Sequence, residues 1–238
     1  KGLNLTMSGT LLELFAASVA FVGIHMAMSS NPIRTPMLAR LGRNSFRLVY
    51  SVITAVLFTW MITAYIHAPT LYVFEANVPM KHVSFTAMGL ACFFIVFGYT
   101  TSNPMAVGKE GKGVKTQAHG VLKITRHPIM WGTALFALCH MLASGHVAAL
   151  IFFGAIAFLA IAGANHIDNN KRRNEKGDWD DFMQATSFVP LVAIIKGRTR
   201  VERGEYKWWQ MALTAALYVA LLMSHEPIIG RHIILLPF

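Results

Sequence analysis

Two of the chain's histidines, His25 and His140, fall inside long apolar runs, whereas the others fall at the ends of such runs or between them. An ionisable side chain surrounded by hydrocarbon is costly, so it is a functional candidate by default. A neutral imidazole can bind haem iron and needs no countercharge in lipid. The pair therefore predicts one b-type haem with His25 and His140 as its axial ligands. For either histidine alone, a hydrogen bond to a neighbouring helix is an equally good interpretation.

The depths of the two histidines set a condition on that haem. His25 lies about five residues from the inner end of its run and His140 about five from the outer end of its own, so at about 1.5 Å per residue their depths differ by roughly 10–15 Å. They converge only if the hairpin that holds His140 stops short of the outer surface, or if TRHPIMWG, residues 125–132, lies mostly above the inner interface. Otherwise His67 would pair with His140, or His127 with His25, as substitute ligands.

The stretch TRHPIMWG, residues 125–132, places an arginine, a histidine and a proline at the start of an apolar run. Pro128 pre-sets the first helical turn and leaves no N–H unpaired there. Arg126 can pair with Asp168 on the next run, or bind a propionate of a cofactor. His127 can donate to a carbonyl or line the mouth of a pocket. We expect an Arg126–Asp168 contact, and two roles stay open for the stretch: locking two helices together, and binding a cofactor or substrate.

The elements that must position these residues are membrane-spanning helices. The chain is 55% hydrophobic and only 13% charged, whereas a soluble domain carries about 25% charged residues. A helix needs roughly 20 apolar residues to cross the hydrocarbon core, and the apolar blocks lack the alternation of a membrane barrel. The expected fold is an all-α integral membrane protein, a single domain over residues 1–238. Its spans, about six, are expected at 11–30, 45–66, 83–102, 128–145, 147–166 and 207–224. The fourth and fifth would form a hairpin.

The distribution of positive charge predicts the orientation of these helices. Of 21 lysines and arginines, 18 fall in the connections 31–47, 103–127 and 167–207, which alternate with the other connections. Basic residues stay on the cytoplasmic side, so both termini are expected on the outer side of a bacterial inner membrane. The net charge of +10 is then a signal of topology that also favours anionic lipid, and it does not indicate a nucleic-acid partner.

The connection 167–207 should hold a short interfacial helix. Its apolar and acidic faces are formed by Trp179, Phe182 and Met183 on one side and by Asp178, Asp180 and Asp181 on the other. The apolar run Phe188–Ile195 is broken at Pro190 and is too short to span, so it dips into the interface or packs on the domain. Cys92 and Cys139 lie inside expected spans and form no disulfide framework or paired-cysteine metal motif.

Three stretches carry a resemblance to a known family. The block over residues 118–172, which includes GVLKITRHPIMWG, resembles the NnrU family of bacterial membrane proteins, as do RTPMLARLGRNSFRLVYS (34–51) and GDWDDFMQATSFVPLVAIIKGR (177–198). Plant and cyanobacterial 15-cis-zeta-carotene isomerases belong to the same family. The resemblance implies a multispanning membrane protein. For its isomerase members it implies a haem b with histidine ligands, which carries over to His25 and His140, while His67 and His127 also fall on family histidine positions.

The resemblance leaves three functions open. The first is cis–trans isomerisation of a lipophilic polyene that reaches a haem from the lipid. The second is a role as an accessory subunit of a respiratory, denitrification or photosynthetic membrane complex, since NnrU proteins occur beside denitrification genes. The third follows from GVLKITRHPIMWG, which is also similar to the entry motif of membrane methyltransferases that use S-adenosylmethionine. Those enzymes present two acids after the hairpin, where this chain has Asp168 alone.

Overall fold

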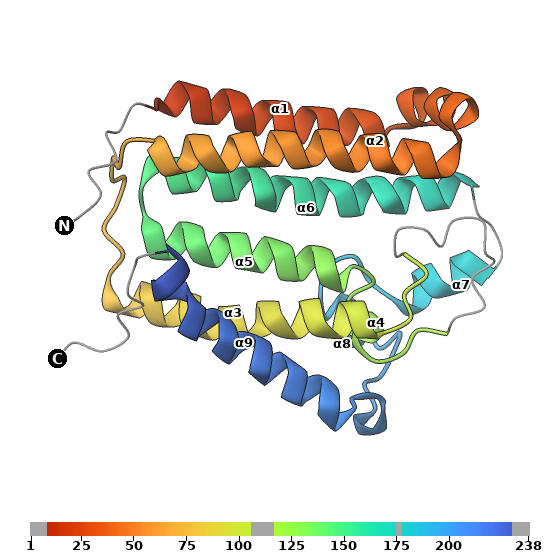
Figure 1. The fold of residues 1–238 in the computed structure, drawn as a ribbon. Coiled ribbons are helices and arrows are strands. Elements are labelled where there is room, and N and C mark those ends of the chain that lie inside the picture. The colour runs from red at the N-terminus through yellow and green to blue at the C-terminus, as the bar shows by residue number, and fades with distance from the viewer. Residues whose placement is uncertain (1–8, 106–116, 175–177, 230–238) are drawn as a thin grey trace. The chain divides into compact units, whose positions relative to one another are not determined.

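The computed structural model describes residues 9–105, 117–174 and 178–229, and these residues form helices and connections without a strand. The helices are α1 (Leu11–Ser29), α2 (Asn31–His67), α3 (Val78–Thr100), α4 (Val121–Ile124), α5 (Pro128–Ser144), α6 (Val147–Asn174), α7 (Asp178–Ala185), α8 (Val192–Ile195) and α9 (Trp208–Ile229), with the 3-10 turn η1 (Arg203–Glu205) before the last. The expected all-α fold is confirmed (Figure 1).

Five of the described helices, α1, α2, α3, α6 and α9, are long and apolar enough to cross a membrane. The helix α5 is apolar but has only 17 residues, somewhat fewer than the roughly 20 that a full crossing needs. Its bounds agree with the expected run at 128–145. The helices α6 and α9 extend several residues beyond the spans expected from the apolar runs.

The segment 31–47, expected as a connection, is helical instead. Pro32 lies in the first turn of α2, where its missing N–H costs nothing, and the helix continues to His67. It bends at Gly42, whose φ of 75° and ψ of 166° fall outside the helical region. A φ of this sign is readily adopted by glycine alone. Arg34 and Arg40 therefore lie on a short helical piece, which Figure 1 draws folded away from the remainder of α2, and Arg43 and Arg47 lie just after the bend.

The helices form two compact units, and the prediction of a single domain stays a prediction. The first unit consists of Lys1–Asn77 and His140–Leu159. Within it α1 packs along α2, as Figure 1 shows. Leu14, Ala17 and Met61 are fully buried between these helices. The segment before α3 binds the turn before α6, since the Val73 N–H donates to the Gly145 carbonyl at 2.9 Å.

The second unit consists of Val78–Cys139 and Ala160–Phe238, and in it α3 packs against α9 (Figure 1). One cluster of buried side chains fills its core: Phe94, Phe97, Met105, Val121, Leu122, Trp179 and Phe182. Close approach of α5 to α3 depends on Gly132, where a Cβ would lie 2.7 Å from Ile95 Cγ1 and 2.9 Å from the Ala91 carbonyl.

The short helix expected near residue 180 is confirmed as α7, but its apolar face is not left for the membrane. Trp179 and Phe182 are 1% and 3% exposed, because the core of the second unit covers them. The following run does not span either. It forms α8, whose Ala193 is fully buried and donates its N–H to the Ser187 hydroxyl at 3.0 Å. This part of the run packs on the protein, whereas Val189, Leu191 and Ile195 are exposed, so a position in the membrane interface stays a prediction.

Candidate functional site

The stretch 125–132 lies between two helices and is bound to the loop that precedes α8. Thr125 ends α4 in extended conformation, and Pro128 opens α5. Backbone hydrogen bonds flank the stretch: the Arg126 N–H donates to the Ser187 carbonyl at 3.0 Å, and the Leu191 N–H donates to the Ile124 carbonyl at 2.8 Å. The loop therefore fixes the backbone on which Arg126 and His127 stand.

Two side chains of the same stretch reinforce this binding. The Thr125 hydroxyl, fully buried, donates to the Phe188 carbonyl at 2.8 Å, and the Trp131 indole N–H donates to that carbonyl at 2.8 Å. Because one carbonyl has two lone pairs, it can accept both bonds. The Phe188 carbonyl is thus bound by one residue before and one residue after the Arg126–His127 pair in the chain.

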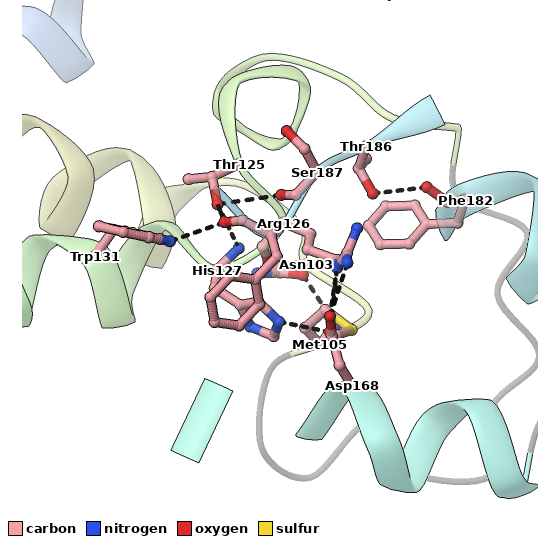
Figure 2. Close-up of polar contacts among 11 residues, drawn as sticks. Asn103, Met105, Thr125, Arg126, His127, Trp131, Asp168, Phe182, Thr186 and Ser187 are labelled. Carbon is pink, nitrogen blue, oxygen red and sulfur yellow. Dashed lines mark hydrogen bonds and ion pairs between the residues drawn. The ribbon is translucent and has the colours of Figure 1, made fainter. Parts of the chain in front are cut away.

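Asp168 of α6 receives both charged side chains of the stretch. Arg126 Nε and Nη2 donate to its Oδ2 at 2.9 and 2.7 Å, and His127 Nε2 donates to its Oδ1 at 2.6 Å. All three side chains are at most 6% exposed. Figure 2 shows the carboxylate between the guanidinium and the imidazole. The expected Arg126–Asp168 contact is confirmed. Because Nε also donates to Oδ1 at 3.1 Å, the guanidinium binds both carboxylate oxygens, as in bidentate arginine–carboxylate pairs.

Asn103 completes this buried polar group from the end of α3. Its amide donates to the Arg126 carbonyl at 3.3 Å, and its Oδ1 accepts from the Met105 N–H at 2.9 Å. Asn103, Thr125 and Ser187 were not identified from the sequence. Asn103-Pro104 reads as an ordinary helix stop, and no spacing rule relates residues 103, 125 and 187.

The arrangement bears on the two roles that the sequence left open for TRHPIMWG. Both carboxylate oxygens of Asp168 are engaged by protein donors, so the side chain ties α6 to the entry of α5. A carboxylate held in this way is less available to a cationic cosubstrate such as S-adenosylmethionine. The contacts therefore support the role of holding α5 and α6 together. They use Nε and Nη2 of Arg126 and not its Nη1.

His25, on α1, lies in the first unit beside Tyr50 of α2. His25 Nε2 shares a hydrogen bond of 2.7 Å with the Tyr50 hydroxyl, and its ring also contacts the ring of Phe21. Its Nδ1 is buried and has no hydrogen-bond partner among the described residues. A buried nitrogen without a partner is unfavourable unless something else binds it. One of the two ring nitrogens of His25 is therefore hydrogen-bonded and the other is not.

His140, near the end of α5, belongs to the same unit and stacks on Phe153 of α6 at 4.6 Å between centroids. A run of ring contacts joins the two histidines through four phenylalanines: His25–Phe21, Phe21–Phe58, Phe58–Phe152, Phe152–Phe153 and Phe153–His140. The structure thus places His25 and His140 in one aromatic environment.

The remaining histidines of interest have different surroundings. His67, at the end of α2, donates from Nδ1 to the Thr63 carbonyl at 2.8 Å. His146 was expected at a wet helix end, but it is 4% exposed and its Nδ1 accepts the Ala149 N–H at 3.1 Å. That bond caps the first turn of α6, which explains the burial. In the residues that the structure describes, no three His, Cys, Asp or Glu side chains are grouped for a metal ion.

Comparison with known proteins adds the family. The family model described as NnrU protein matches residues 13–233, nearly the whole chain. The chain belongs to the NnrU family. A curated relative of this NnrU protein is the 15-cis-zeta-carotene isomerase, chloroplastic, of Arabidopsis thaliana, which is 28% identical over 132 residues. The match covers 55% of this chain but 36% of the plant protein. No solved structure matches the chain significantly.

Proposed function

We propose that this NnrU protein is a haem b-binding membrane isomerase that acts on a double bond of a lipophilic polyene. The observation that carries the proposal is the state of His25: one ring nitrogen is held by the Tyr50 hydroxyl and the other is buried without a partner. An axial ligand needs this division of roles, with one nitrogen for the metal and the other oriented by a hydrogen bond. The distant likeness to a zeta-carotene isomerase supplies the reaction type.

The residues of the first unit fit such a group. If His25 Nε2 carries the proton and donates to the Tyr50 oxygen, Nδ1 keeps its lone pair for a metal. His140 would supply the second imidazole, with His67 and His127 as the substitutes that the sequence suggests. The phenylalanine rings that link His25 and His140 are flat and apolar, as the neighbours of a macrocycle or a polyene need to be.

A haem held here would supply an iron centre whose electronic interaction with a conjugated chain lowers the barrier to rotation about one double bond. The chain's own residues would bind and orient. Tyr50 would fix the orientation of the His25 ring through its hydrogen bond with Nε2, and a proton on Nε2 would leave Nδ1 for the metal. Phe21, Phe58 and Phe153 keep water from the site and offer a hydrocarbon-like surface to a polyene.

The proposed setting is a bacterial inner membrane crossed six times, with α5 as the short fourth crossing in a hairpin with α6 and both termini on the outer side. The asymmetry of basic residues supports this orientation. The substrate would then enter from the lipid, and no soluble carrier is required.

Optical spectra of the purified full-length chain test the proposal. Reduction should give a sharp Soret band with split visible bands, and His25→Ala and His140→Ala should each shift or abolish it. His82→Ala is a suitable control, because His82 is exposed and its Nδ1 already bonds the Val78 carbonyl. His146→Ala is not, since that residue caps α6.

Three other results would redirect the assignment. Iron-free, colourless wild-type protein would exclude the haem, and an unchanged reduced spectrum in the His25→Ala, His140→Ala double variant would exclude this ligand pair. Haem with no isomerisation of any polyene tested would leave the accessory-subunit role. Binding of S-adenosylmethionine without haem would favour the methyltransferase, against the engagement of Asp168 by Arg126 and His127.

A further inference from the structure

A cavity of about 560 Å³ lies in the second unit, bordered by α7, the loop before α8 and the end of α6. Its lining contains three arginines, Arg126, Arg172 and Arg198, and one carboxylate, Asp180. Met183 and Val192 are among the apolar side chains of its wall. The proposed haem ligands His25 and His140 do not line it, so the cavity is separate from the proposed haem site.

Arg126 presents a free edge to this cavity. Its Nε and Nη2 are bound to Asp168, and the described residues provide no acceptor for its Nη1. The residue is 5% exposed and still lines the cavity, so its remaining N–H groups are held at a fixed place by the buried ion pair. A cation fixed in this way can bind a ligand with little loss of side-chain entropy.

The other two arginines add charge that Asp168 does not neutralise. Arg198 donates from Nη1 to the Gln184 carbonyl at 2.9 Å, which orients its guanidinium. Within the described parts of the chain, Arg172 and Arg198 form no ion pair with a carboxylate. Among the lining residues that the structure describes, Asp180 is the sole acid, so these residues carry an excess of positive charge.

We propose that this cavity binds a phosphate ester: the phosphate between the three guanidinium groups, and the attached carbon chain against Met183 and Val192. Guanidinium groups match the oxygens of phosphate through paired N–H donors. A volume of about 560 Å³ is within the roughly 300–1,000 Å³ of small-molecule sites. The same chemistry is offered by an anionic phospholipid headgroup and by a soluble phosphate ester, and the wall of apolar side chains suits both.

Two arms of one experiment separate these sources, both on the purified full-length chain. In the first, nanodiscs of phosphatidylcholine with or without phosphatidylglycerol are used, and retained lipid is measured by mass spectrometry after detergent extraction. In the second, calorimetry follows titration with glycerol 3-phosphate and with inorganic phosphate. Selective retention of phosphatidylglycerol identifies the lipid source, and saturable binding of glycerol 3-phosphate identifies the soluble one.

Matched variants connect the binding to the cavity. The double variant Arg172→Gln, Arg198→Gln should weaken binding by roughly tenfold or more, since charged hydrogen bonds are lost. The double variant Arg173→Gln, Arg200→Gln removes the same charge from exposed residues outside the lining and should leave it unchanged. Asp180→Asn should strengthen binding, which misfolding cannot mimic. Absence of binding in both arms, or equal loss in the two double variants, would overturn the proposal.

Discussion

At the scale of single residues, Asp168 shows why a charged group can be buried in this protein. Its carboxylate is balanced by Arg126 and hydrogen-bonded by His127, and its side chain is 4% exposed. A buried ion pair gives little net stability compared with an apolar pair of the same shape, but removing one partner leaves an uncompensated charge. Breaking the pair is therefore costly, so residues 125–132 must keep Arg126 and His127 within hydrogen-bond distance of Asp168.

The cost of breaking this pair predicts how strongly different substitutions of Arg126 lower the stability of the protein. Arg126→Ala should lower the free energy of unfolding by about 3–5 kcal/mol, and Arg126→Lys by less, because lysine keeps the charge but not the two-pronged contact. Denaturant titration in detergent, followed by tryptophan fluorescence, measures both. Arg200→Ala, at an exposed position, serves as the control. Equal midpoints for Arg126→Ala and wild type would show that the buried pair is not needed.

Tyr50 is the second residue whose single contact can be tested. If the hydroxyl orients His25 as a ligand, Tyr50→Phe should keep the haem spectrum in form but weaken haem retention by roughly 10–100-fold, as for other groups that orient a metal ligand. Haem transfer to apomyoglobin measures the loss rate. Tyr72→Phe changes an exposed hydroxyl and should have no effect. A Tyr50→Phe protein with wild-type retention would remove Tyr50 from the proposed site.

At the scale of elements, the apolar runs predicted most helices because hydrocarbon-length blocks have few alternatives. They failed at the segment 31–47, where arginines suggested a loop although the backbone is helical up to the bend at Gly42. The amphipathic pattern predicted α7 itself but not what covers its apolar face, because the pattern is the same whether Trp179 is covered by lipid or by Phe94 and Leu122. The polar contacts of Asn103 and Ser187 depend on long-range packing, which no local pattern encodes.

The turn between α5 and α6 gives an element-scale prediction. Gly145 has a φ of 65°, and a Cβ there would collide with the carbonyl of Phe74. Gly145→Ala should lower the free energy of unfolding by about 1–3 kcal/mol, the usual cost of such backbone strain. Gly23→Ala is the matched control, since nothing lies within 4 Å of its added Cβ and alanine favours helix. Differential scanning fluorimetry should place the Gly145→Ala midpoint lowest; equal midpoints would contradict the clash.

A second contact between elements joins α4 to η1. Lys123 Nζ lies 2.7 Å from Glu205 Oε1, and the Tyr206 hydroxyl donates to the Gly120 carbonyl at 3.2 Å. Burial favours a higher pKa for Glu205, but the hydrogen bond and charge of Lys123 outweigh it and lower the pKa. Burial likewise opposes the charge of Lys123, and the contacts with Glu205 and Glu202 raise its pKa. Burial, with the charge of Glu205, raises the pKa of Tyr206 to about 12.

These directions define the pH range in which the contact stabilises the protein. The lowered pKa of Glu205 gives stability that is present above its ordinary pKa of 4.5 and lost as the pH falls through the lower, folded value. The raised pKa of Lys123 gives stability that is present below 10.5 and lost as the pH rises through the higher, folded value. Glu205→Gln should therefore destabilise the protein at neutral pH and flatten the acid limb of its thermal midpoint. Glu13→Gln is the control, and an unchanged acid limb in Glu205→Gln would refute the assignment.

At the scale of the whole molecule, 18 of the 21 lysines and arginines lie in the three segments 31–47, 103–127 and 167–207. Helix formation alone does not require this concentration. The arginines of segment 31–47 lie on α2 on both sides of its bend at Gly42, and others lie at the end of α6 and between α8 and α9. A charge on a helix extension is as effective a barrier to translocation as a charge in a loop, since the cost is that of moving it through hydrocarbon. The correction at segment 31–47 therefore leaves the orientation argument intact.

The orientation can be tested with reporter fusions along the chain. Reporters fused after residues 40, 110 and 200 should be cytoplasmic, because those positions lie within the three basic segments that hold 18 of the 21 lysines and arginines. Fusions after residues 75 and 145 should be periplasmic and act as internal controls. Replacing Arg34 and Arg40, the basic residues that precede the first fusion point, together by Gln should reduce the cytoplasmic fraction of the first reporter without altering the third, since basic residues act mainly within about 15–20 residues of a span. A periplasmic reporter at 110 would require α3 or an earlier helix not to cross, and the six-crossing arrangement with both termini outside would then be wrong.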